Sequence, residues 1–211
     1  SGKSTLLKTI NRLVEPTSGR VLLDGEDVTS HDATAMRRTM GYVFQRIGLF
    51  PHLSVAENIA IGPRLVGERL SEARIGELLT LVDLDPAMAS RLPDALSGGQ
   101  QQRVGVARAL AGNPALLLMD EPFGALDPVT RDALGERVRD LHESLDLTSI
   151  MVTHDMAEAL ILADRVLVMD AGRIVADETP QALASGKGGE IAQALVAVPR
   201  NQAERLKALE A

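Results

Sequence analysis

The chain has 211 residues, of which 45% are hydrophobic and 24% are charged, so it is long enough for one ordinary globular domain with a buried core. This composition excludes a collagen, a coiled coil and a disordered chain. The 22 Lys and Arg residues against 29 Asp and Glu residues give a net charge of −7, which excludes the basic surface expected of a nucleic-acid-binding protein. The sequence contains no Cys, so it forms neither a disulfide nor a thiolate metal site.

The apolar runs of the sequence are short. Runs such as Ala115–Met119 and Val166–Met169 fall far below the roughly 20 residues that a helix needs to cross a bilayer, so any membrane role is expected to be peripheral. The opening residues, Ser1-Gly2-Lys3-Ser4-Thr5, contain neither an initiator Met nor the features of a signal peptide. We therefore expect the chain to be a fragment of a longer protein.

The first half of the chain predicts mainly helices. The expected elements are a helix over Thr5–Leu13, a hairpin of Arg20–Leu23 and Glu26–Thr29, a helix over Ala33–Arg38 and a short strand over Tyr42–Phe44. Residues 54 to 85 have a helical pattern that breaks at Gly62-Pro63 and at Gly67. A further helix follows Ser97 and ends at Leu110. This block, about residues 54–110, contains no convincing strand and is expected to be a helical subdomain.

The second half alternates strands with helices. Ala115–Met119 is entirely apolar, which is typical of a strand buried on both faces. The later elements are helices over Val129–Leu145 and Met156–Leu162, strands over Ser149–Val152 and Arg165–Met169, an antiparallel edge strand over Arg173–Ala176, a hinge at Gly186–Gly189 and a tail helix over Gln202–Leu209. The alternation predicts an α/β fold in which helices flank a mainly parallel sheet, with a C-terminal helical tail over residues 181–211.

Gly2-Lys3-Ser4 matches the end of G-x-x-x-x-G-K-[ST], the loop in which backbone N–H groups and a lysine cradle phosphates while the hydroxyl binds Mg²⁺. Thr5 follows it at the start of the predicted helix. The alternative is a Ser-capped helix that carries a surface lysine.

Asp120 and Glu121 follow a buried strand, so they are expected at its carboxyl end, where open α/β sheets bind ligands. Asp120 is placed to hold Mg²⁺, and Glu121 is placed to activate an attacking water as a general base. The alternative is that the two carboxylates only cap the next segment.

Ser97-Gly98-Gly99-Gln100, after Leu96, opens a helix whose backbone N–H groups are accessible to an anion. Alone it could be an ordinary capped helix start. Before a carboxylate pair of this kind, however, Leu96-Ser97-Gly98-Gly99-Gln100 resembles the signature of the ATP-binding cassette (ABC) ATPases.

Other motifs fall in the order that this resemblance implies. Gln45 resembles the glutamine that contacts Mg²⁺ and the attacking water. Gly124-Ala125-Leu126-Asp127 resembles the loop that crosses to the other subunit, and Thr153-His154-Asp155 resembles the switch whose histidine contacts the γ-phosphate. Taken singly, each motif has an ordinary alternative. Gln45 could be a polar residue at a strand end, and Asp127 could form an Asp-Pro turn with Pro128. His154 could be a residue at a helix entry beside a capping Asp155.

The resemblance covers the chain to about Pro180. It implies that residues 1–180 are an ABC nucleotide-binding domain, a phosphate-loop NTPase core that lacks its N-terminal strands and carries the helical subdomain. It implies ATP and Mg²⁺ as cofactors and a head-to-tail pair with a second copy or a homologous cassette. One copy would contribute Gly2, Lys3, Ser4, Thr5, Gln45, Asp120, Glu121 and His154, and the other would contribute Ser97, Gly98, Gly99, Gln100 and the crossing Asp127.

The resemblance also implies partners. These are transmembrane permease subunits, indirectly a solute-binding protein, and no nucleic acid, with the chain peripheral at the cytoplasmic face of the plasma membrane. The loop Arg46–Leu53 exposes Leu49 and Phe50 after Gln45 and is expected to contact the membrane subunit.

Two longer stretches, Gly48–Ile59 and Met119–Pro128, resemble bacterial importer ATPases. Gln45–His52 together with Gly99–Arg108 is closest to the osmoprotectant group, which imports glycine betaine, choline or carnitine. The sequence departs from that group at Phe44 and Arg46, and an importer of another small solute, such as an amino acid or another amine, is the alternative.

Two further classes are disfavoured. A soluble ABC ATPase acting on DNA or ribosomes would need an insertion, and only about 50 residues separate Gln45 from Leu96. A catalytically inactive regulatory cassette is disfavoured because the chemical residues are all present, namely Lys3, Gln45, Asp120, Glu121 and His154.

Overall fold

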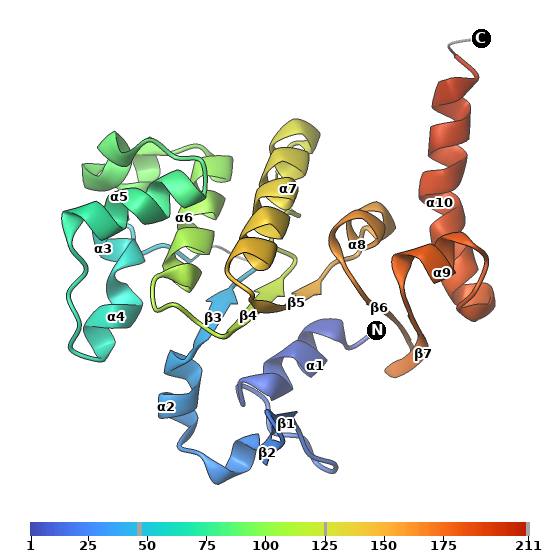
Figure 1. Ribbon diagram of the computed structural model, residues 1–211, viewed down its shortest axis with the longest axis horizontal. Helices are drawn as coiled ribbons and strands as arrows, with labels where there is room; N and C mark the ends of the chain where they lie inside the picture. Colours follow the sequence, from blue (N-terminus) through green and yellow to red (C-terminus); the bar gives the residue numbers. More distant parts are fainter. Residues whose placement is uncertain (46–47, 125, 210–211) are drawn as a thin grey trace. The chain divides into compact units, whose positions relative to one another are not determined.

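The computed structural model describes residues 1–45, 48–124 and 126–209. The chain divides into two compact units (Figure 1), a larger one formed by Ser4–Val152 and a smaller one formed by Ser1–Lys3 with Thr153–Ala211. Each unit has its own cluster of buried apolar side chains.

The larger unit is built on a parallel sheet. Its strands β3 (Met40–Val43), β4 (Leu116–Asp120) and β5 (Thr148–Val152) lie in the order β3-β4-β5. Every residue of the central strand β4 is buried, as the apolar run predicts. Because all pairs are parallel, the carboxyl ends of the three strands meet at one edge of the sheet.

Helices cover both faces of this sheet (Figure 1). On one face, Leu7 of α1 (Lys3–Ile10) packs against Leu116, Leu118 and Val152. On the other lies α6 (Gly98–Leu110), whose backbone comes so close to β3 that a Cβ at Gly41 would be 2.6 Å from the carbonyl oxygen of Ala109. The predicted α/β class is confirmed.

The region before α6 is helical, as expected. It contains α3 (Val55–Ile59), α4 (Ile61–Leu65), α5 (Glu72–Leu81) and the 3₁₀ turns Pro86–Ser90 and Pro93–Ala95. The break at Gly67 is confirmed. The break expected around Gly62-Pro63 falls at Ala60, between α3 and α4, and Pro63 lies in the first turn of α4, where its missing N–H is tolerated.

The larger unit also contains the short hairpin β1 (Leu22–Leu23) and β2 (Glu26–Asp27), the 3₁₀ turn Val28–Ser30, α2 (Ala33–Arg38) and α7 (Pro128–Ser144). α1 ends before the predicted Leu13 because Arg12 adopts a left-handed φ of 57° and the Leu13 N–H turns back to the Lys8 carbonyl at 2.9 Å. β3 starts two residues earlier than predicted and leaves Phe44 outside the strand.

The smaller unit consists of α8 (Met156–Leu162), β6 (Val166–Asp170), β7 (Arg173–Glu178), α9 (Pro180–Ala184) and α10 (Gly189–Lys207). The expectation that the strand near 165–169 joins the parallel sheet is wrong. β6 pairs in antiparallel fashion with β7 in a sheet of their own, and it buries alternate residues, as a half-exposed hairpin strand does.

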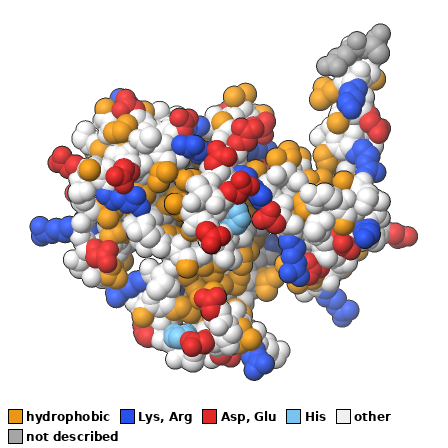
Figure 2. Space-filling model, viewed as in Figure 1, with side chains coloured by type: hydrophobic (Ala, Val, Ile, Leu, Met, Phe, Trp, Pro, Cys, Tyr) orange, Lys and Arg blue, Asp and Glu red, His pale blue; other side chains and the backbone are white. Residues whose placement is uncertain are grey.

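The predicted tail helix is the end of α10, which follows left-handed backbone at Gly186 and Gly188. Within the described ranges, no helix is both long and apolar enough to span a membrane. On the face shown in Figure 2, Lys and Arg side chains are scattered among Asp and Glu side chains rather than gathered in one patch.

Candidate functional site

Polar side chains meet at the carboxyl edge of the parallel sheet. Asp120 ends β4 and is only 4% exposed, and it accepts a hydrogen bond from the Ser4 hydroxyl of α1 at 2.7 Å. Gln45, two residues beyond β3, donates its amide to Glu121 Oε2 at 2.9 Å. Ser4 therefore does not cap a helix, and four residues from three distant parts of the sequence form one cluster.

Glu121 has an unusual backbone conformation. Its φ of 47° lies in the left-handed region, which costs a residue other than glycine about 1–3 kcal/mol. Its N–H donates to the Val152 carbonyl at 2.9 Å, across from the end of β5. The fold thus holds the Glu121 backbone in place while its carboxylate receives the Gln45 amide.

Tyr42 lies beside this cluster and is a residue that the sequence analysis missed. Its hydroxyl is buried and has no hydrogen-bond partner within the described part of the chain. Burial, and secondarily the negative charge of Asp120, raises the pKa of Tyr42 to about 12. The phenol is therefore neutral at physiological pH and available as a hydrogen-bond donor.

The donor set fits a hard divalent cation such as Mg²⁺. Ser4, Gln45 and Asp120 offer a hydroxyl, an amide carbonyl and a carboxylate, which are the oxygen donors that Mg²⁺ prefers. In the described residues, no group of three His, Cys, Asp or Glu side chains could hold a metal. Mg²⁺ is ordinarily bound by one or two carboxylates together with substrate phosphates and water, so a set this sparse suits a cation that arrives with a phosphate ligand.

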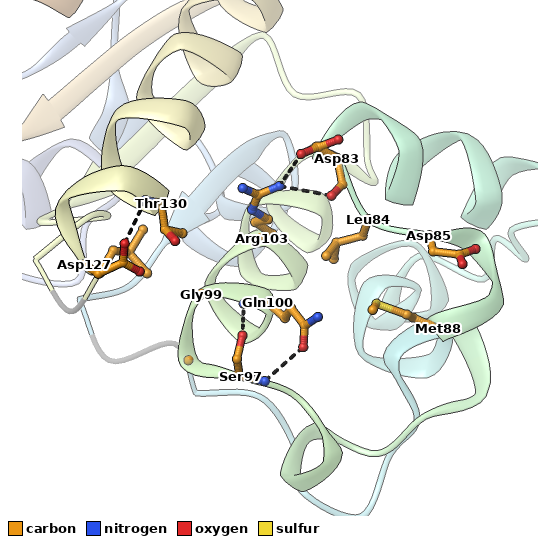
Figure 3. Close-up of a pocket in the computed structure, with 12 residues that line it drawn as sticks. Asp83, Leu84, Asp85, Met88, Ser97, Gly99, Gln100, Arg103, Asp127 and Thr130 are labelled. Atoms are coloured by element: carbon orange, nitrogen blue, oxygen red, sulfur yellow. Dashed lines mark hydrogen bonds and ion pairs between the residues drawn. The ribbon is translucent and has the colours of Figure 1, made fainter.

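A second polar feature of the larger unit is a pocket of about 480 Å³ (Figure 3). It is lined by the segment after α5, by the start of α6 and by the start of α7. The lining residues are Asp83, Leu84, Asp85, Met88, Ser97, Gly98, Gly99, Gln100, Arg103, Leu126, Asp127 and Thr130.

Two helices begin at this pocket. Ser97 caps α6, because its hydroxyl accepts from the Gln100 N–H at 3.2 Å while the Gln100 side chain accepts from the Ser97 N–H at 2.9 Å. Asp127 caps α7 by accepting from the Thr130 N–H at 3.0 Å. The hydrogen bonds from Thr130 hold the pKa of Asp127 below its usual range. The capping alternative considered for Ser97 is therefore confirmed as local structure, whereas Asp127, considered as part of an Asp-Pro turn, is a helix cap.

The pocket is also accessible to an anion at its α6 side. A Cβ on Gly98 would meet no atom within 4 Å among the residues that the structure describes, so the space beside this glycine is open. The positive ends of two helix dipoles line the same pocket and favour negative charge there. Arg103, further along α6, also lines the pocket and donates to the Asp83 carboxylate at 2.7 Å (Figure 3).

The other predicted site residues are found elsewhere. Thr5 is exposed on α1, and Gly2, Lys3 and His154 belong to the smaller unit. Within that unit, the Lys3 ammonium donates to the Ser1 hydroxyl at 3.2 Å, His154 is exposed, and Asp155 caps α8, as one alternative had it. The expected phosphate contacts of Gly2, Lys3, Thr5 and His154 remain predictions.

Residues 48–54 are held by two side chains to which no role was assigned from the sequence. Asn58 is fully buried, accepts from the Phe50 N–H at 2.8 Å, and donates to the carbonyls of Phe50, Leu53 and Ser54 at 3.0–3.1 Å. Arg108 of α6 donates to the Gly48 carbonyl at 2.9 Å. Arg46 and Ala125, which belong to two of the motifs, lie outside the described residues.

A family model described as "ABC transporter" matches residues 1–124. Among curated proteins, the chain is 49% identical over 201 residues to the glycine betaine/carnitine/choline transport ATP-binding protein OpuCA of Bacillus subtilis, covering 94% of this chain and 53% of that protein. It is 52% identical over 180 residues to the sulfate/thiosulfate import ATP-binding protein CysA of Rhodopseudomonas palustris, covering 82% of this chain and 51% of that protein. The chain thus spans about half the length of the curated relatives it matches.

Among solved structures, the fold resembles the dimeric post-hydrolysis state of the ATP-binding cassette MJ0796 bound to ADP and Pi. The TM-score is 0.75 at 34% sequence identity, with 85% of this chain and 81% of that chain covered.

Proposed function

The chain belongs to the ABC transporter family, and on this basis we propose that it is the ATP-hydrolysing nucleotide-binding part of a bacterial importer. The single observation that carries the proposal is the polar cluster at the carboxyl edge of the sheet. There a helix hydroxyl meets a buried carboxylate at 2.7 Å, and a second carboxylate is held by an amide at 2.9 Å.

Within one copy, we assign the phosphates of ATP to Gly2, Lys3, Ser4 and Thr5 at the start of α1. Ser4, Gln45 and Asp120 would hold Mg²⁺, which when bound neutralises phosphate charge and stabilises the transition state. Glu121 accepts a proton from, or orients, the attacking water. His154 contacts the terminal phosphate.

The rest of the site comes from a second copy or a homologous cassette. The α6 start at Ser97, Gly98, Gly99 and Gln100 would bind the phosphates of the ATP held by the partner, and Asp127 would lie at the same contact. The open space before Gly98 and the two helix N-termini at the pocket support this assignment. The dimeric state of the MJ0796 cassette supports a two-copy arrangement.

We further propose that the chain binds transmembrane permease subunits at the cytoplasmic face of the plasma membrane, with a solute-binding protein as an indirect partner. The loop that follows Gln45 offers the contact, because Phe50 is 43% exposed although Asn58 fixes the backbone beneath it. An exposed aromatic side chain on a fixed loop is typical of a protein contact.

The solute is assigned to the osmoprotectant class of quaternary amines, which the name of the Bacillus subtilis relative includes. An inorganic anion is the second candidate, because the sulfate/thiosulfate relative is about as similar over the aligned region. A cassette touches ATP and permease rather than the solute, so the motifs do not decide between the two.

The test uses the full transporter, reconstituted with its permease and its binding protein. ATP hydrolysis is measured with glycine betaine, choline, carnitine or sulfate as the added solute. Stimulation by a quaternary amine but not by sulfate supports the proposal, and the reverse supports the second candidate. Absence of hydrolysis under every condition would contradict the ATPase assignment itself.

A further inference from the structure

The proposed reaction gives no role to the Tyr42 hydroxyl, although Tyr42 lies in β3, beside the strand that carries Asp120. The hydroxyl is buried and unpaired within the described part of the chain. A buried polar group without a partner lowers stability, and phenylalanine would fill the same space without that penalty. A packing role alone therefore does not account for a tyrosine at this position.

The register of the sheet places Tyr42 within reach of Asp120. Tyr42 lies opposite Leu118, and Asp120 comes two residues later in β4, so both side chains emerge on the same face of the sheet. Diagonal neighbours in adjacent strands are within reach of an aromatic side chain. The charge of Asp120 in fact contributes to the electrostatic environment of the phenol.

The ring of Tyr42 is held in place by its neighbours. It contacts Phe44 with ring centroids 4.4 Å apart and ring planes tilted by 45°, and it packs on the cluster that contains Leu7 and Leu118. A carboxylate offers about four acceptor positions on two oxygens, and the Ser4 hydroxyl uses one of them, on Oδ1. Asp120 thus has capacity for a second donor from a side chain that is already ordered.

We propose that Tyr42 is a positioning residue for Asp120, and that its hydroxyl donates a hydrogen bond to the Asp120 carboxylate when Mg²⁺ and nucleotide are bound. This inference rests on the proposed function, because it assumes that Asp120 faces Mg²⁺. Hydrogen-bond partners of metal-binding carboxylates typically contribute 10–100-fold to metal affinity.

The test compares Tyr42→Phe with the unmodified chain. Mn²⁺, which replaces Mg²⁺ and is detected by electron paramagnetic resonance, is titrated in the presence of ADP, and the thermal midpoint is measured without metal. We expect the Mn²⁺ Kd to rise about 10-fold or more, with no loss of thermal stability because an unpaired hydroxyl has been removed.

Thr39→Val is the matched control. It also deletes a hydroxyl next to β3, but Thr39 donates to the Met36 carbonyl at 2.8 Å, at the end of the strand away from Asp120. We expect this control to lower the thermal midpoint and to leave the Mn²⁺ Kd unchanged.

A second readout needs no variant. Tyr42 is the sole tyrosine of the sequence, which has no Trp, so tyrosine absorbance and emission report this side chain alone. When Mg²⁺ is added to the ADP-bound chain, the new hydrogen bond to a carboxylate is expected to shift the absorbance to the red and to quench the emission.

The inference requires both the loss of affinity and the spectral change. If the unmodified chain fails to bind Mn²⁺ with ADP, the proposed function and the inference are both overturned. If it binds, but Tyr42→Phe keeps the same Kd or the tyrosine spectrum stays constant, the inference alone is overturned. A clear loss of stability in Tyr42→Phe also overturns it, because the hydroxyl would then already be paired in the fold.

Discussion

Glu121 illustrates how much geometry one residue supplies. Its left-handed backbone and its hydrogen bond to the Val152 carbonyl fix where the side chain starts, and the Gln45 amide fixes where it ends. Because the Glu121 side chain is fixed at its backbone and at its carboxylate, it loses little conformational freedom when a water molecule binds. Orientation of this kind is one of the larger contributions that an active site makes to a reaction rate.

At this scale, Glu121→Gln is expected to slow ATP hydrolysis about 10²–10⁴-fold, because the amide keeps the shape but cannot accept the proton from water. ATP binding should stay within a few-fold of the unmodified value, since the phosphate-binding residues are intact. The measurement is single-turnover hydrolysis together with equilibrium binding. Glu136→Gln, the same change at an exposed position in α7, is the control and should leave both unchanged. Near-normal hydrolysis in Glu121→Gln would refute the assignment.

Among the elements, helix starts were the most predictable feature and strand partners the least. α2 and α8 have their predicted bounds because Asp32 and Asp155 cap them through local hydrogen bonds. The antiparallel strand after the turn at Ala171-Gly172 was predicted and is confirmed as the partner of β6. The expectation that β6 belongs to the parallel sheet was wrong, since membership of a sheet depends on residues distant in sequence.

The site shows the same difference between local features, which the sequence predicts, and contacts between distant residues, which it does not. Motifs identified Gln45, Asp120 and Glu121, but the hydrogen bond between Gln45 and Glu121 joins residues 76 positions apart, and no local pattern encodes it. Asn58 did carry a signal, because it is a polar residue three positions from the apolar Val55 and from the apolar Ile61 in a helical pattern. Tyr42 carried none, since an aromatic residue in a strand is ordinary.

The cap of α7 allows a test that separates structure from charge. Asp127→Asn keeps a side-chain oxygen that accepts from the Thr130 N–H, so we expect a thermal midpoint close to that of the unmodified chain. Asp127→Ala loses the cap and should lower the midpoint by about a few degrees.

The pH dependence of stability should report the Asp127 carboxylate as well. Because the folded state lowers the pKa of Asp127, its stabilising effect is present above the ordinary aspartate pKa and is lost as the pH falls through the folded value. The Asp127→Asn variant should lack this part of the acid dependence. Identical acid profiles for the two chains would count against the cap as the source of the shift.

Asn58 fixes the backbone of residues 50–54. Asn58→Asp would place a carboxylate oxygen against three carbonyls that now receive an N–H, so we expect the free energy of unfolding to fall by about 3 kcal/mol. Chemical denaturation measures the effect. Asn201→Asp, at an exposed position of α10, is the control and should change stability little. A loss below about 1 kcal/mol for Asn58→Asp would show that the loop is not held as described.

At the level of the whole molecule, the polar cluster and the pocket of the larger unit are separate sites with separate chemistry. One supplies carboxylates and an amide, and the other supplies helix N-termini that favour an anion. A nucleotide that binds the cluster of one copy and the pocket of another would join the two copies.

This arrangement predicts how the oligomeric state responds to ATP. With Mg²⁺ and ATP, Glu121→Gln is expected to form a dimer by light scattering, because bound nucleotide is not consumed. Adding Ser97→Asp should keep the chain monomeric, since aspartate still caps α6 but repels phosphate. Ser71→Asp, the same change at the cap of α5, should leave the dimer intact. A monomer in Glu121→Gln, or a dimer with Ser97→Asp, would exclude the two-copy site.

Gly41 carries a consequence for how this sequence is able to vary. A Cβ there would lie 2.6 Å from the Ala109 carbonyl oxygen and 2.8 Å from the Leu117 side chain, and backbone has no room to yield. In a saturation mutagenesis library selected for growth on transported solute, position 41 should tolerate glycine alone, although its residue has no side chain to offer to ATP, metal or partner. Substitutions at position 41 would reduce growth as much as substitutions at the residues proposed to act in catalysis. Intolerance to mutation alone would therefore not distinguish the close contact between α6 and β3 from the active site.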